Sequence, residues 1–417
     1  MLGVVAIVIA VAAAVALAAG AAAGRLFYLV PAEHGGAPGW LRGILAGLGP
    51  RLDARAGAAL LVLLFASYLV ALACADAIPA RLVIAAIVAL HVVFLLAPPL
   101  FSADVFSYID YARLGAIHGL SPYAHGAAAA PGDAVTPFVG WHDIASPYGP
   151  VFTLGSYVLA HASLAVTLWV YKLVAALAGL GCVALVWRLA LRTGQPPLRA
   201  AMLVGLNPLF LAYGVGGAHN DMLMEALALS AIASGLRERH AVAGAQLALA
   251  GLIKASAGLV IAFMLAGTRR PTRTLTGAVT ATVLVGLAAS AVHAGQLFGF
   301  AAQLFGQQHL VAHFSVPNQL GLLLGQGGLT PPIRVACTAG FAAALLCLLW
   351  RARQGADWIV CAGWATLAGL LASAWLMPWY VVWLLPLAAI APSSRLRLAT
   401  LALCAFVLAT RVTAHLL

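Results

Sequence analysis

The residues that could perform chemistry gather in one segment of the chain, between positions 101 and 148. Four of the eleven acidic residues lie there, at Asp104, Asp110, Asp133 and Asp143. A carboxylate can accept the proton of an attacking hydroxyl group, which is the role of a general base. The same segment holds other polar side chains that can bind a substrate: His118, His125, His142, Tyr108, Tyr111, Tyr123, Tyr148 and Arg113. We therefore expect a catalytic or binding site in this segment.

A helix is predicted at the start of the segment. Ser102 is a typical N-cap residue, which would place Asp104 in the first turn. At about 100° per residue, one side of this helix is polar and carries Asp104, Tyr108, Tyr111, Gly115 and His118. Another side is apolar and carries Val105, Ile109, Ala112 and Ala116. In the alternative interpretation, Asp104 only stabilises the helix N-terminus.

A second polar group, His219-Asn220-Asp221, follows the flexible run Gly214–Ala218 and precedes an apolar helix. Unpaired backbone N–H groups at a helix N-terminus bind phosphate, and the His219 side chain could assist them. The alternative is that Asn220 or Asp221 is an ordinary N-cap. Both interpretations place these residues at the start of a helix.

Lys254 lies inside the apolar run 241–266. An ionisable group at membrane depth costs several kcal/mol unless it is paired or functional. Its ammonium could pair with Asp221 or with Glu225, or it could contact an anionic lipid head group. We favour the contact with an anionic head group.

The composition shows which kind of protein must position these residues. Of 417 residues, 64% are hydrophobic and 8% are charged, and the mean hydropathy is +1.03. Soluble domains carry roughly 25% charged residues. Because backbone groups in lipid must pair internally, apolar stretches near 20 residues are transmembrane helices. We expect an all-α integral membrane protein, folded as one membrane domain over 1–417, whose polar helix lies along the membrane surface with its apolar side in lipid.

Thirteen apolar spans suggest about 11–13 transmembrane helices. They fall near 2–24, 57–75, 80–100, 149–164, 167–190, 200–217, 222–236, 241–266, 274–292, 332–350, 358–375, 378–391 and 397–416. The first span has no charged start and no cleavage site, so a retained helix is expected rather than a signal peptide. Two long polar connections, 101–148 and 293–331, are predicted outer loops.

The 22 Lys and Arg residues against 11 acidic ones are explained by membrane topology. Arginines cluster between spans, as in cytoplasmic loops under the positive-inside rule. Nucleic-acid binding is not expected, because basic patches interleaved with aromatic residues are missing. The rule places His219-Asn220-Asp221, Lys254, loop 293–331 and the turn Met377–Tyr380 on the extracytoplasmic side. The chemistry of segment 101–148 places it with them. Connection 25–55 conflicts with this: it must lie outside with 101–148, yet it carries four arginines. Either one early span does not cross, or the charge rule is broken there.

Six short motifs occur in an order that resembles the GT-C superfamily of glycosyltransferases. They are Ser102-Ala-Asp-Val-Phe-Ser-Tyr108, His118-Gly-Leu-Ser-Pro-Tyr123, Ser146-Pro-Tyr-Gly-Pro150, Gly217-Ala-His-Asn-Asp221, Ile253-Lys254 and Pro378-Trp-Tyr380. The resemblance runs from about residue 95 to 390 and is greatest to bacterial polyprenol-phosphate-mannose-dependent α-mannosyltransferases. The order is specific to the superfamily and much less so to the sugar.

The resemblance implies a helical bundle of GT-C type that moves a sugar, mannose above all, from a polyprenyl phosphate to an extracytoplasmic glycan or glycolipid. Asp104 matches the position of the family's catalytic base. One displacement would invert the anomeric centre. We expect the departing phosphate to be held by Lys254, His219, Arg113 and Asn220. The substrates would contact Tyr108, Asp110, Tyr111, His118, Tyr123, His142, Asp143, Tyr148 and Asp221.

No metal is expected at this site. Some members of the superfamily carry two adjacent acids in this loop, whereas here Asp104 is flanked by Ala103 and Val105. A metal site formed by Asp104 with Asp143 or His142 stays open as an alternative.

Two other functions compete with the transferase. A carrier or flippase of a lipid-linked sugar would spread polar residues through the middle of the membrane, whereas here they crowd to one face. A structural subunit would not need Asp104, Lys254 and His219 together. Within the enzyme class, arabinose, glucose and galactosamine compete with mannose as the transferred sugar.

Overall fold

The computed structural model describes residues 1–23, 38–45, 47–49, 52–292, 299–306 and 309–414, and in these residues the chain is helical without strands. Five helices of 20–29 residues are long and apolar enough to cross a membrane. The expectation of an all-α integral membrane protein is confirmed. Several of the predicted continuous spans are instead short or broken helices.

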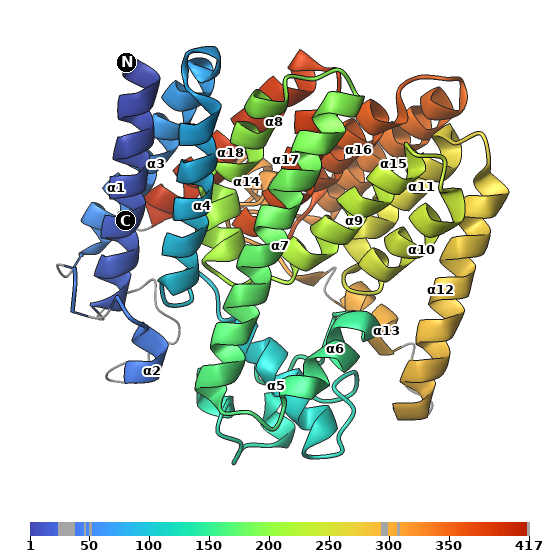
Figure 1. The fold of residues 1–417 in the computed structure, drawn as a ribbon. Coiled ribbons are helices and arrows are strands. Elements are labelled where there is room, and N and C mark those ends of the chain that lie inside the picture. The colour runs from blue at the N-terminus through green and yellow to red at the C-terminus, as the bar shows by residue number, and fades with distance from the viewer. Residues whose placement is uncertain (24–37, 46, 50–51, 293–298, 307–308, 415–417) are drawn as a thin grey trace.

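The N-terminal part of the chain forms one side of the bundle. Helix α1 (Leu2–Ala22) packs against both α3 (Ala54–Ala73) and α4 (Ala80–Leu96), and α7 (Leu164–Arg192) packs against α4. In Figure 1 the chain starts at the upper end, descends through α1, returns through α3 and descends again through α4. The short helix α2 (Gly39–Arg42) lies at the lower end.

Helix α2 lies at the same end of the bundle as segment 101–148. Trp40 of α2 accepts a hydrogen bond at its carbonyl oxygen from Trp169 Nε1 at 3.0 Å, and Leu41 is buried in the same apolar cluster as Val105. Residues 25–37, 46 and 50–51 of the predicted connection 25–55 lie outside the described residues. The conflict between this connection and the charge rule therefore stays open.

Three helical hairpins turn back within the depth of the bundle, in the described part of the chain. The first hairpin begins with α8 (Pro197–Gly205) and a π-helical segment (Leu209–Val215), which are bent by 51° relative to each other and run downwards in Figure 1. Helix α9 (Asp221–Gly235) then runs back upwards. The predicted apolar span 200–217 is bent at Asn207-Pro208, where Asn207 Oδ1 accepts the N–H of Leu209 at 2.9 Å.

The other two hairpins have the same form. Helix α10 (His240–Gly251) descends and α11 (Gly258–Gly267) returns, so the expected continuous span 241–266 is broken around Lys254. Helix α16 (Trp358–Ala372) descends and is followed by a 3-10 helix (Pro378–Trp383) and α17 (Leu385–Ile390). The turns of all three hairpins contribute residues to one site.

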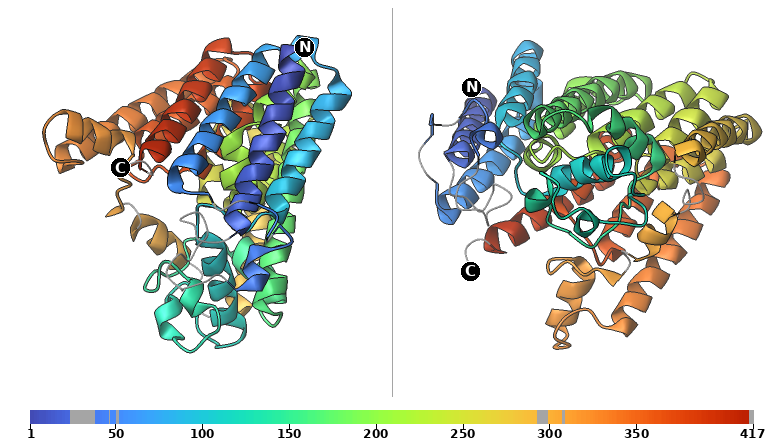
Figure 2. Two further views of the ribbon diagram at one scale, coloured as in Figure 1. Left: turned by 90° about the vertical axis from the view of Figure 1, so that its left-hand side faces the viewer. Right: turned by 90° about the horizontal axis from the view of Figure 1, so that it is seen from below.

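The remaining long helices flank these hairpins: α12 (Pro271–Val292), α15 (Pro331–Arg353) and α18 (Ser394–Ala414). Two short helices lie in the expected second outer loop, α13 (Gly299–Gly306) and α14 (Val316–Leu323). Figure 2 shows α13 beside the layer formed by segment 101–163.

Segment 101–163 forms a layer across one end of the bundle. It contains α5 (Asp104–Ala116), α6 (Pro150–Ser156) and 3-10 turns at Ala127–Ala129, Thr136–Phe138 and Tyr157–Leu159. The predicted helix is confirmed, but its expected position with one side in lipid is wrong. Helix α5 is buried on nearly all sides, from Val105 to Leu114, because α6, α7 and the loop after it enclose it.

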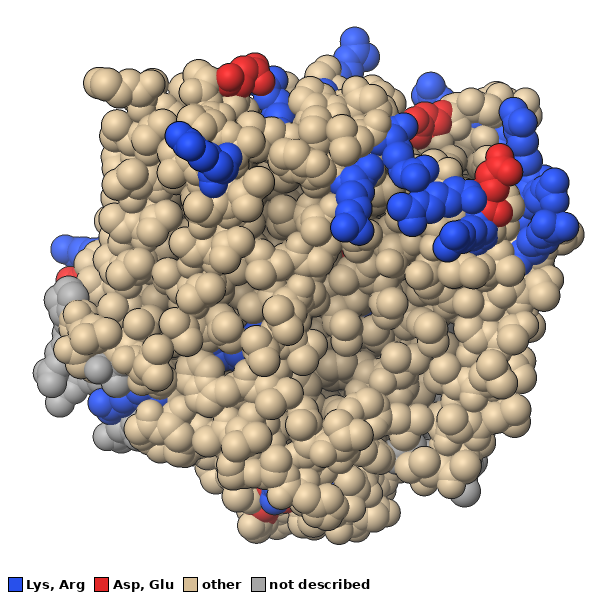
Figure 3. Space-filling model, viewed as in Figure 1, with Lys and Arg blue, Asp and Glu red and all other residues tan. Residues whose placement is uncertain are grey.

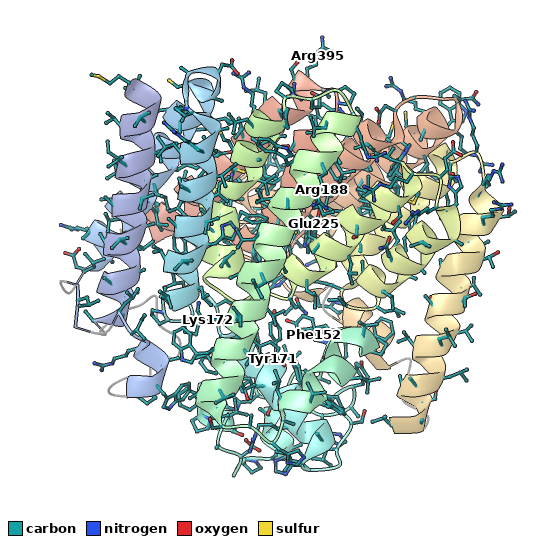
Figure 4. The ribbon with its side chains drawn as sticks, in the orientation of Figure 1. Phe152, Tyr171, Lys172, Arg188, Glu225 and Arg395 are labelled. Carbon is teal, nitrogen blue, oxygen red and sulfur yellow. The ribbon has the colours of Figure 1, made fainter. Side chains whose placement is uncertain are left out.

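Most Lys and Arg residues gather away from this layer. Figure 3 shows Lys and Arg side chains along the upper edge of the molecule, above a broad face with few charged groups. Arg188 and Arg395 lie in the upper part of Figure 4, whereas Tyr171 and Phe152 lie in the lower part. An uncharged band between a charged edge and a polar layer is typical of a multi-pass membrane protein.

Candidate active site

Asp104 is the first residue of α5, where the layer meets the hairpin turns of the bundle. Its backbone N–H donates to Ser102 Oγ at 3.1 Å, but the N-cap of α5 is Ala103, so the expectation that Ser102 is the N-cap is wrong. Phe101, with a positive φ of 62°, turns the chain into this helix and stacks on Tyr213, with the ring centroids 4.5 Å apart. The carboxylate is thereby directed at the turns of the hairpins.

Two side chains meet the Asp104 carboxylate. Tyr148 donates its hydroxyl to Oδ2 at 3.4 Å, and His219 Nδ1 lies 3.6 Å from the same oxygen. The Asp104 side chain is 20% exposed, whereas the His219 side chain is fully buried. Burial raises the pKa of Asp104, and the Lys254 charge and the Ser102 hydrogen bond oppose this. A carboxylate with a raised pKa is a stronger proton acceptor.

The turn 216–220 holds His219 in place. The imidazole stacks on Trp379, with ring centroids 4.0 Å apart and an angle of 18° between the planes. Lys172, which is fully buried on α7, donates from Nζ to the carbonyl oxygen of Gly216 at 2.9 Å. Tyr108 donates its hydroxyl to Asn220 Oδ1 at 3.4 Å. The turn is thus bound to α5, α7 and the third hairpin.

Lys254 and Asp221 join two hairpins through an ion pair. Lys254 Nζ lies 2.8 and 2.7 Å from the two carboxylate oxygens of Asp221, whose side chain is completely buried. Trp383 Nε1 donates to Asp221 Oδ1 at 2.6 Å. The structural alternative considered for Lys254, pairing with Asp221, is therefore observed. Because two of the three ammonium N–H groups reach Asp221, one is left for a ligand.

Aromatic rings surround the Lys254 ammonium. Its Nζ lies 5.1 Å from the ring centroid of Tyr380, 5.5 Å from Trp383 and 5.9 Å from Tyr148. Cation–π contacts of this length stabilise a desolvated ammonium. From the sequence, Trp375, Trp379, Tyr380 and Trp383 would most simply form an aromatic belt at the membrane interface. That interpretation is wrong, because the third hairpin turns inward and places these rings on the site.

Two cavities adjoin at Lys254. The smaller, about 290 Å³, is partly polar and is lined by Asp104, Ser102, Tyr111, Tyr148 and Trp141, among others. The larger, about 620 Å³, extends between α9, α11, α15 and α16, and Glu225 and Arg334 are among its lining residues. Both cavities have mostly apolar walls with a similar polar share. Four residues line both cavities: Lys254, Leu310, Trp375 and Tyr380. An elongated ligand that passes Lys254 fits this pair of cavities.

The chain around Tyr148 is fixed by a close backbone approach. Gly149 N–H donates to the carbonyl oxygen of Ile253 at 3.0 Å, and Val151 N–H donates to that of Leu252 at 3.0 Å. A Cβ atom at Gly149 would lie 2.1 Å from the Leu252 carbonyl oxygen. Only glycine permits this contact, which places Tyr148 beside Lys254.

Three sequence-predicted residues form a separate cluster. Arg113 Nε donates to both carboxylate oxygens of Asp133 at 2.8 and 3.0 Å, and His118 Nε2 lies 2.7 Å from Asp133 Oδ2. Arg113 also donates to the carbonyl oxygen of Ala160 at 2.9 Å. Burial acts to raise the pKa of Asp133, but these hydrogen bonds lower it below its usual value. The structure does not bring Arg113 or His118 to Asp104 and Lys254.

The other predicted residues lie on both sides of α5. Tyr111 lines the smaller cavity and donates to the carbonyl oxygen of Ile144 at 2.8 Å. Asp110 is buried beside the cluster around Asp133, and burial, together with the Asp133 charge, raises its pKa to about 7. Tyr123 is buried against Phe300, where burial raises its pKa to about 12. The structure does not bring Asp110 or Tyr123 to the cavity with Asp104.

His142 and Asp143 are exposed at the outer surface of the layer. In the described residues, no three His, Cys, Asp or Glu side chains are placed to hold a metal ion. The expectation of a site without a metal stays a prediction.

Sequence analysis missed Lys172, Trp379 and Trp383 as site residues. Lys172 could have been found, because it is an ionisable residue inside the apolar run 167–190, like Lys254 in its own run. Trp379 lies in the motif Pro378-Trp-Tyr380, which could have indicated it, whereas nothing in the sequence distinguishes Trp383 from a residue at the membrane interface. Their role follows from the inward turn of the third hairpin.

Fold and site together define a multi-pass membrane protein in which Asp104, His219 and Lys254 lie together beside two adjoining cavities. A family model described as "Alpha-(1->6)-mannopyranosyltransferase, N-terminal domain" matches residues 1–270, and a model described as "MptB C-terminal domain" matches residues 310–413. The chain belongs to this alpha-(1->6)-mannopyranosyltransferase family.

Curated relatives carry the same name. Alpha-(1->6)-mannopyranosyltransferase A of Mycobacterium tuberculosis is 31% identical over 348 residues, which are 74% of this chain and 64% of that protein. Alpha-(1->6)-mannopyranosyltransferase A of Corynebacterium glutamicum is 31% identical over 199 residues, 46% of this chain and 39% of that protein. The chain thus covers less than two thirds of the length of either relative. No solved structure matches the chain.

Proposed function

We propose that the chain transfers a mannosyl group from a polyprenyl-phosphate-linked donor to a hydroxyl group of a glycan or glycolipid acceptor. Membership of the alpha-(1->6)-mannopyranosyltransferase family supports mannose and an α-linked product. The observation that carries the proposal is the pair of adjoining cavities that share Lys254. A prenyl-phosphate sugar would place its sugar in the cavity with Asp104, its anionic phosphate at Lys254 and its apolar tail in the larger cavity.

Asp104 acts as the base in this reaction. As the acceptor oxygen attacks the anomeric carbon, the bond from that carbon to the phosphate oxygen breaks, and Asp104 takes the acceptor proton. The products are the glycoside and the free prenyl phosphate. Attack from the side opposite the phosphate inverts the anomeric centre, so a β-linked donor gives an α-linked product. No strong general acid is needed, because a prenyl phosphate is already a good leaving group.

Lys254 faces the departing phosphate, whereas His219 and Asn220, two other predicted phosphate ligands, are buried and line neither cavity. Negative charge grows on this group in the transition state, and a fixed ammonium in a site shielded from water stabilises that charge. Asp221 and Trp383 hold the ammonium at the junction of the cavities. Because the leaving group meets a cation of the protein, we expect transfer without a divalent metal. EDTA should then leave the rate unchanged.

The active site is proposed to face the extracytoplasmic side of a bacterial plasma membrane. The arginine-rich ends of the helices would lie in the cytoplasm under the positive-inside rule. The layer with Asp104 forms the opposite end of the bundle (Figures 1 and 3). A glycan acceptor would reach the smaller cavity from that side.

The test compares mannosyl transfer by wild type, Asp104→Asn and Glu238→Gln in one preparation. The proteins are reconstituted in vesicles with radiolabelled polyprenyl-phosphate mannose and membrane acceptors. Glu238, an exposed residue at the arginine-rich end, is the matched control for replacing an acid with an amide. We expect Asp104→Asn to lose at least about a hundredfold in rate and Glu238→Gln to keep the wild-type rate.

The outcomes separate the two functions considered. Full transfer by Asp104→Asn would refute Asp104 as the base and leave the transferase in place. If no protein transfers mannose and the labelled lipid only changes leaflet, the carrier of a lipid-linked sugar is the correct function. A carrier would move the lipid equally well as the wild type and as the Asp104→Asn variant, because translocation needs no base.

A further inference from the structure

A third cavity lies at the arginine-rich end, away from the proposed active site. Its volume is about 390 Å³, and residues of α3, α8, α17 and α18 line it. None of its lining residues lines the two cavities that share Lys254. The catalytic argument therefore gives this cavity no role.

Two guanidinium groups line the cavity, those of Arg199 and Arg397. Arg397 Nη1 donates to Gln195 Oε1 at 3.0 Å and to the carbonyl oxygen of Ala391 at 2.9 Å. Arg199 Nη2 contacts Asp76 Oδ2 at 3.1 Å. Arg199 Nε is buried without a hydrogen-bond partner in the described residues. Both arginines thus keep N–H donors that a bound anion could use.

The helix dipoles add to the positive potential. Helix α8 begins at Pro197 and α18 begins at Ser394, so Arg199 and Arg397 lie in the first turns of their helices. The first N–H groups of a helix lack intrahelical partners and favour an anion. The acid beside Arg199, Asp76, has a side chain that is 83% exposed. Its charge is screened by solvent and only partly offsets two arginines and two helix ends.

The remaining walls are hydrocarbon. They are formed by leucines of α3, α8 and α18: Leu69, Leu72, Leu203, Leu398 and Leu401. Leu398 is 70% exposed and Leu69 is 37% exposed on the outside of the bundle. A cationic pocket with apolar, outward-facing walls can accept a charged head group and the first part of an acyl chain. A soluble phosphate compound would leave these leucines without a partner.

We propose that this cavity binds the phosphodiester head group of an anionic membrane lipid. The two guanidinium groups donate to the phosphate oxygens in the charge-assisted geometry that arginine favours. The leucines contact the acyl chains. Basic pockets between helices at one membrane surface are typical sites for anionic head groups. The lipid links the ends of α3, α8 and α18, so its binding stabilises the fold.

The test measures unfolding of the full chain in nanodiscs of phosphatidylcholine, with increasing fractions of phosphatidylglycerol. We expect the unfolding temperature of wild type to rise with phosphatidylglycerol. In Arg199→Gln/Arg397→Gln the half-maximal lipid fraction should increase at least about tenfold. Arg395→Gln is the matched control, because Arg395 is exposed on the same helix and does not line the cavity. It should respond as wild type does.

A second variant protects the test against misfolding. Arg199→Gln removes only the contact with exposed Asp76, so it should fold in phosphatidylcholine and still lose several-fold in lipid sensitivity. Inorganic phosphate, added to discs of phosphatidylcholine, should not reproduce the stabilisation. An unchanged response of both cavity variants would overturn the proposal. So would equal stabilisation by inorganic phosphate, because that would indicate a soluble anion instead of a lipid.

Discussion

Lys254 and Asp221 lie at the turns of two different hairpins, and Lys254 Nζ is within 2.8 Å of both Asp221 carboxylate oxygens. The pair fixes the first hairpin relative to the second at the depth where the cavities meet. Removing one member of a buried ion pair leaves the other charge without compensation. The free energy of unfolding that is lost when each residue is replaced alone, and when both are replaced together, therefore measures how strongly this pair joins the hairpins.

The first prediction concerns stability. Lys254→Met should destabilise the protein by about 3 kcal/mol, because the Asp221 carboxylate stays buried with only Trp383 as an observed donor. Lys254→Met/Asp221→Asn should recover part of that loss. Unfolding of the purified variants in a denaturant titration measures both effects. If the double variant is less stable than Lys254→Met by the full cost of Asp221→Asn alone, the two residues are not coupled.

The second prediction concerns the pH dependence of transfer. Asp104 must be deprotonated to act as a base, and burial raises its pKa. The rate constant kcat/KM should therefore fall on acidification, with a midpoint above the usual value of about 3.9 for aspartate. The donor phosphodiester stays singly charged in this range and cannot cause the decline. Radiolabel transfer between pH 4 and 9 gives the profile, and a flat profile to pH 4 would contradict the assignment.

The third prediction uses Asp110 as a probe of stability against pH. Its pKa of about 7 lies above the unfolded value, so the folded state binds the extra proton, and stability falls as pH rises from about 4 to 7. The free energy of unfolding falls by up to about 1.4 kcal/mol per pH unit. Asp133, His118 and Arg113 are the charged groups nearby.

Asp110→Asn cannot ionise and should lack this decline. It should match wild type near pH 4 and be the more stable protein above pH 7. Thermal unfolding in detergent at a series of pH values makes the comparison. Equal slopes for the two proteins would show that another group is responsible.

The fourth prediction assigns Lys172 a positioning role. Its ammonium donates to Gly216, whose carbonyl oxygen also accepts the N–H of Leu100 at 3.2 Å. Lys172→Met therefore leaves that carbonyl satisfied and should cost less than about 1.5 kcal/mol in stability. Transfer should fall about tenfold, because turn 216–220 carries His219 and loses one of its supports. The loss should appear in kcat with little change in KM, and transfer at the wild-type rate would refute the role.

The fifth prediction tests the contact between α6 and the second hairpin. Gly149→Ala would push a Cβ atom against the Leu252 carbonyl oxygen, so Tyr148 and Lys254 should separate and transfer should fall about tenfold or more. Gly155→Ala is the matched control on the same helix, because its Cβ would meet nothing within 4 Å. Both variants are assayed side by side, and equal effects would show that the close approach has no special role.

Several features of this protein follow from the sequence alone. Hydropathy and charge content determine an all-α membrane protein, because apolar residues in lipid require helices whose backbone groups pair internally. The local pattern from Ser102 determines helix α5 and places Asp104 in its first turn. The ordered motifs indicate the family. These are local or compositional properties, and each can be obtained without knowing which segments meet.

Only the tertiary structure decided which residues share the site. Arg113 and Lys254 looked alike as phosphate ligands, yet Arg113 pairs with Asp133 while Lys254 reaches the junction of the cavities. Trp383 looked like a residue at the membrane interface and instead donates to Asp221. The difference arises because three hairpins turn back inside the bundle. Hydropathy records how apolar a segment is, but not the depth at which it reverses or the turn it meets there.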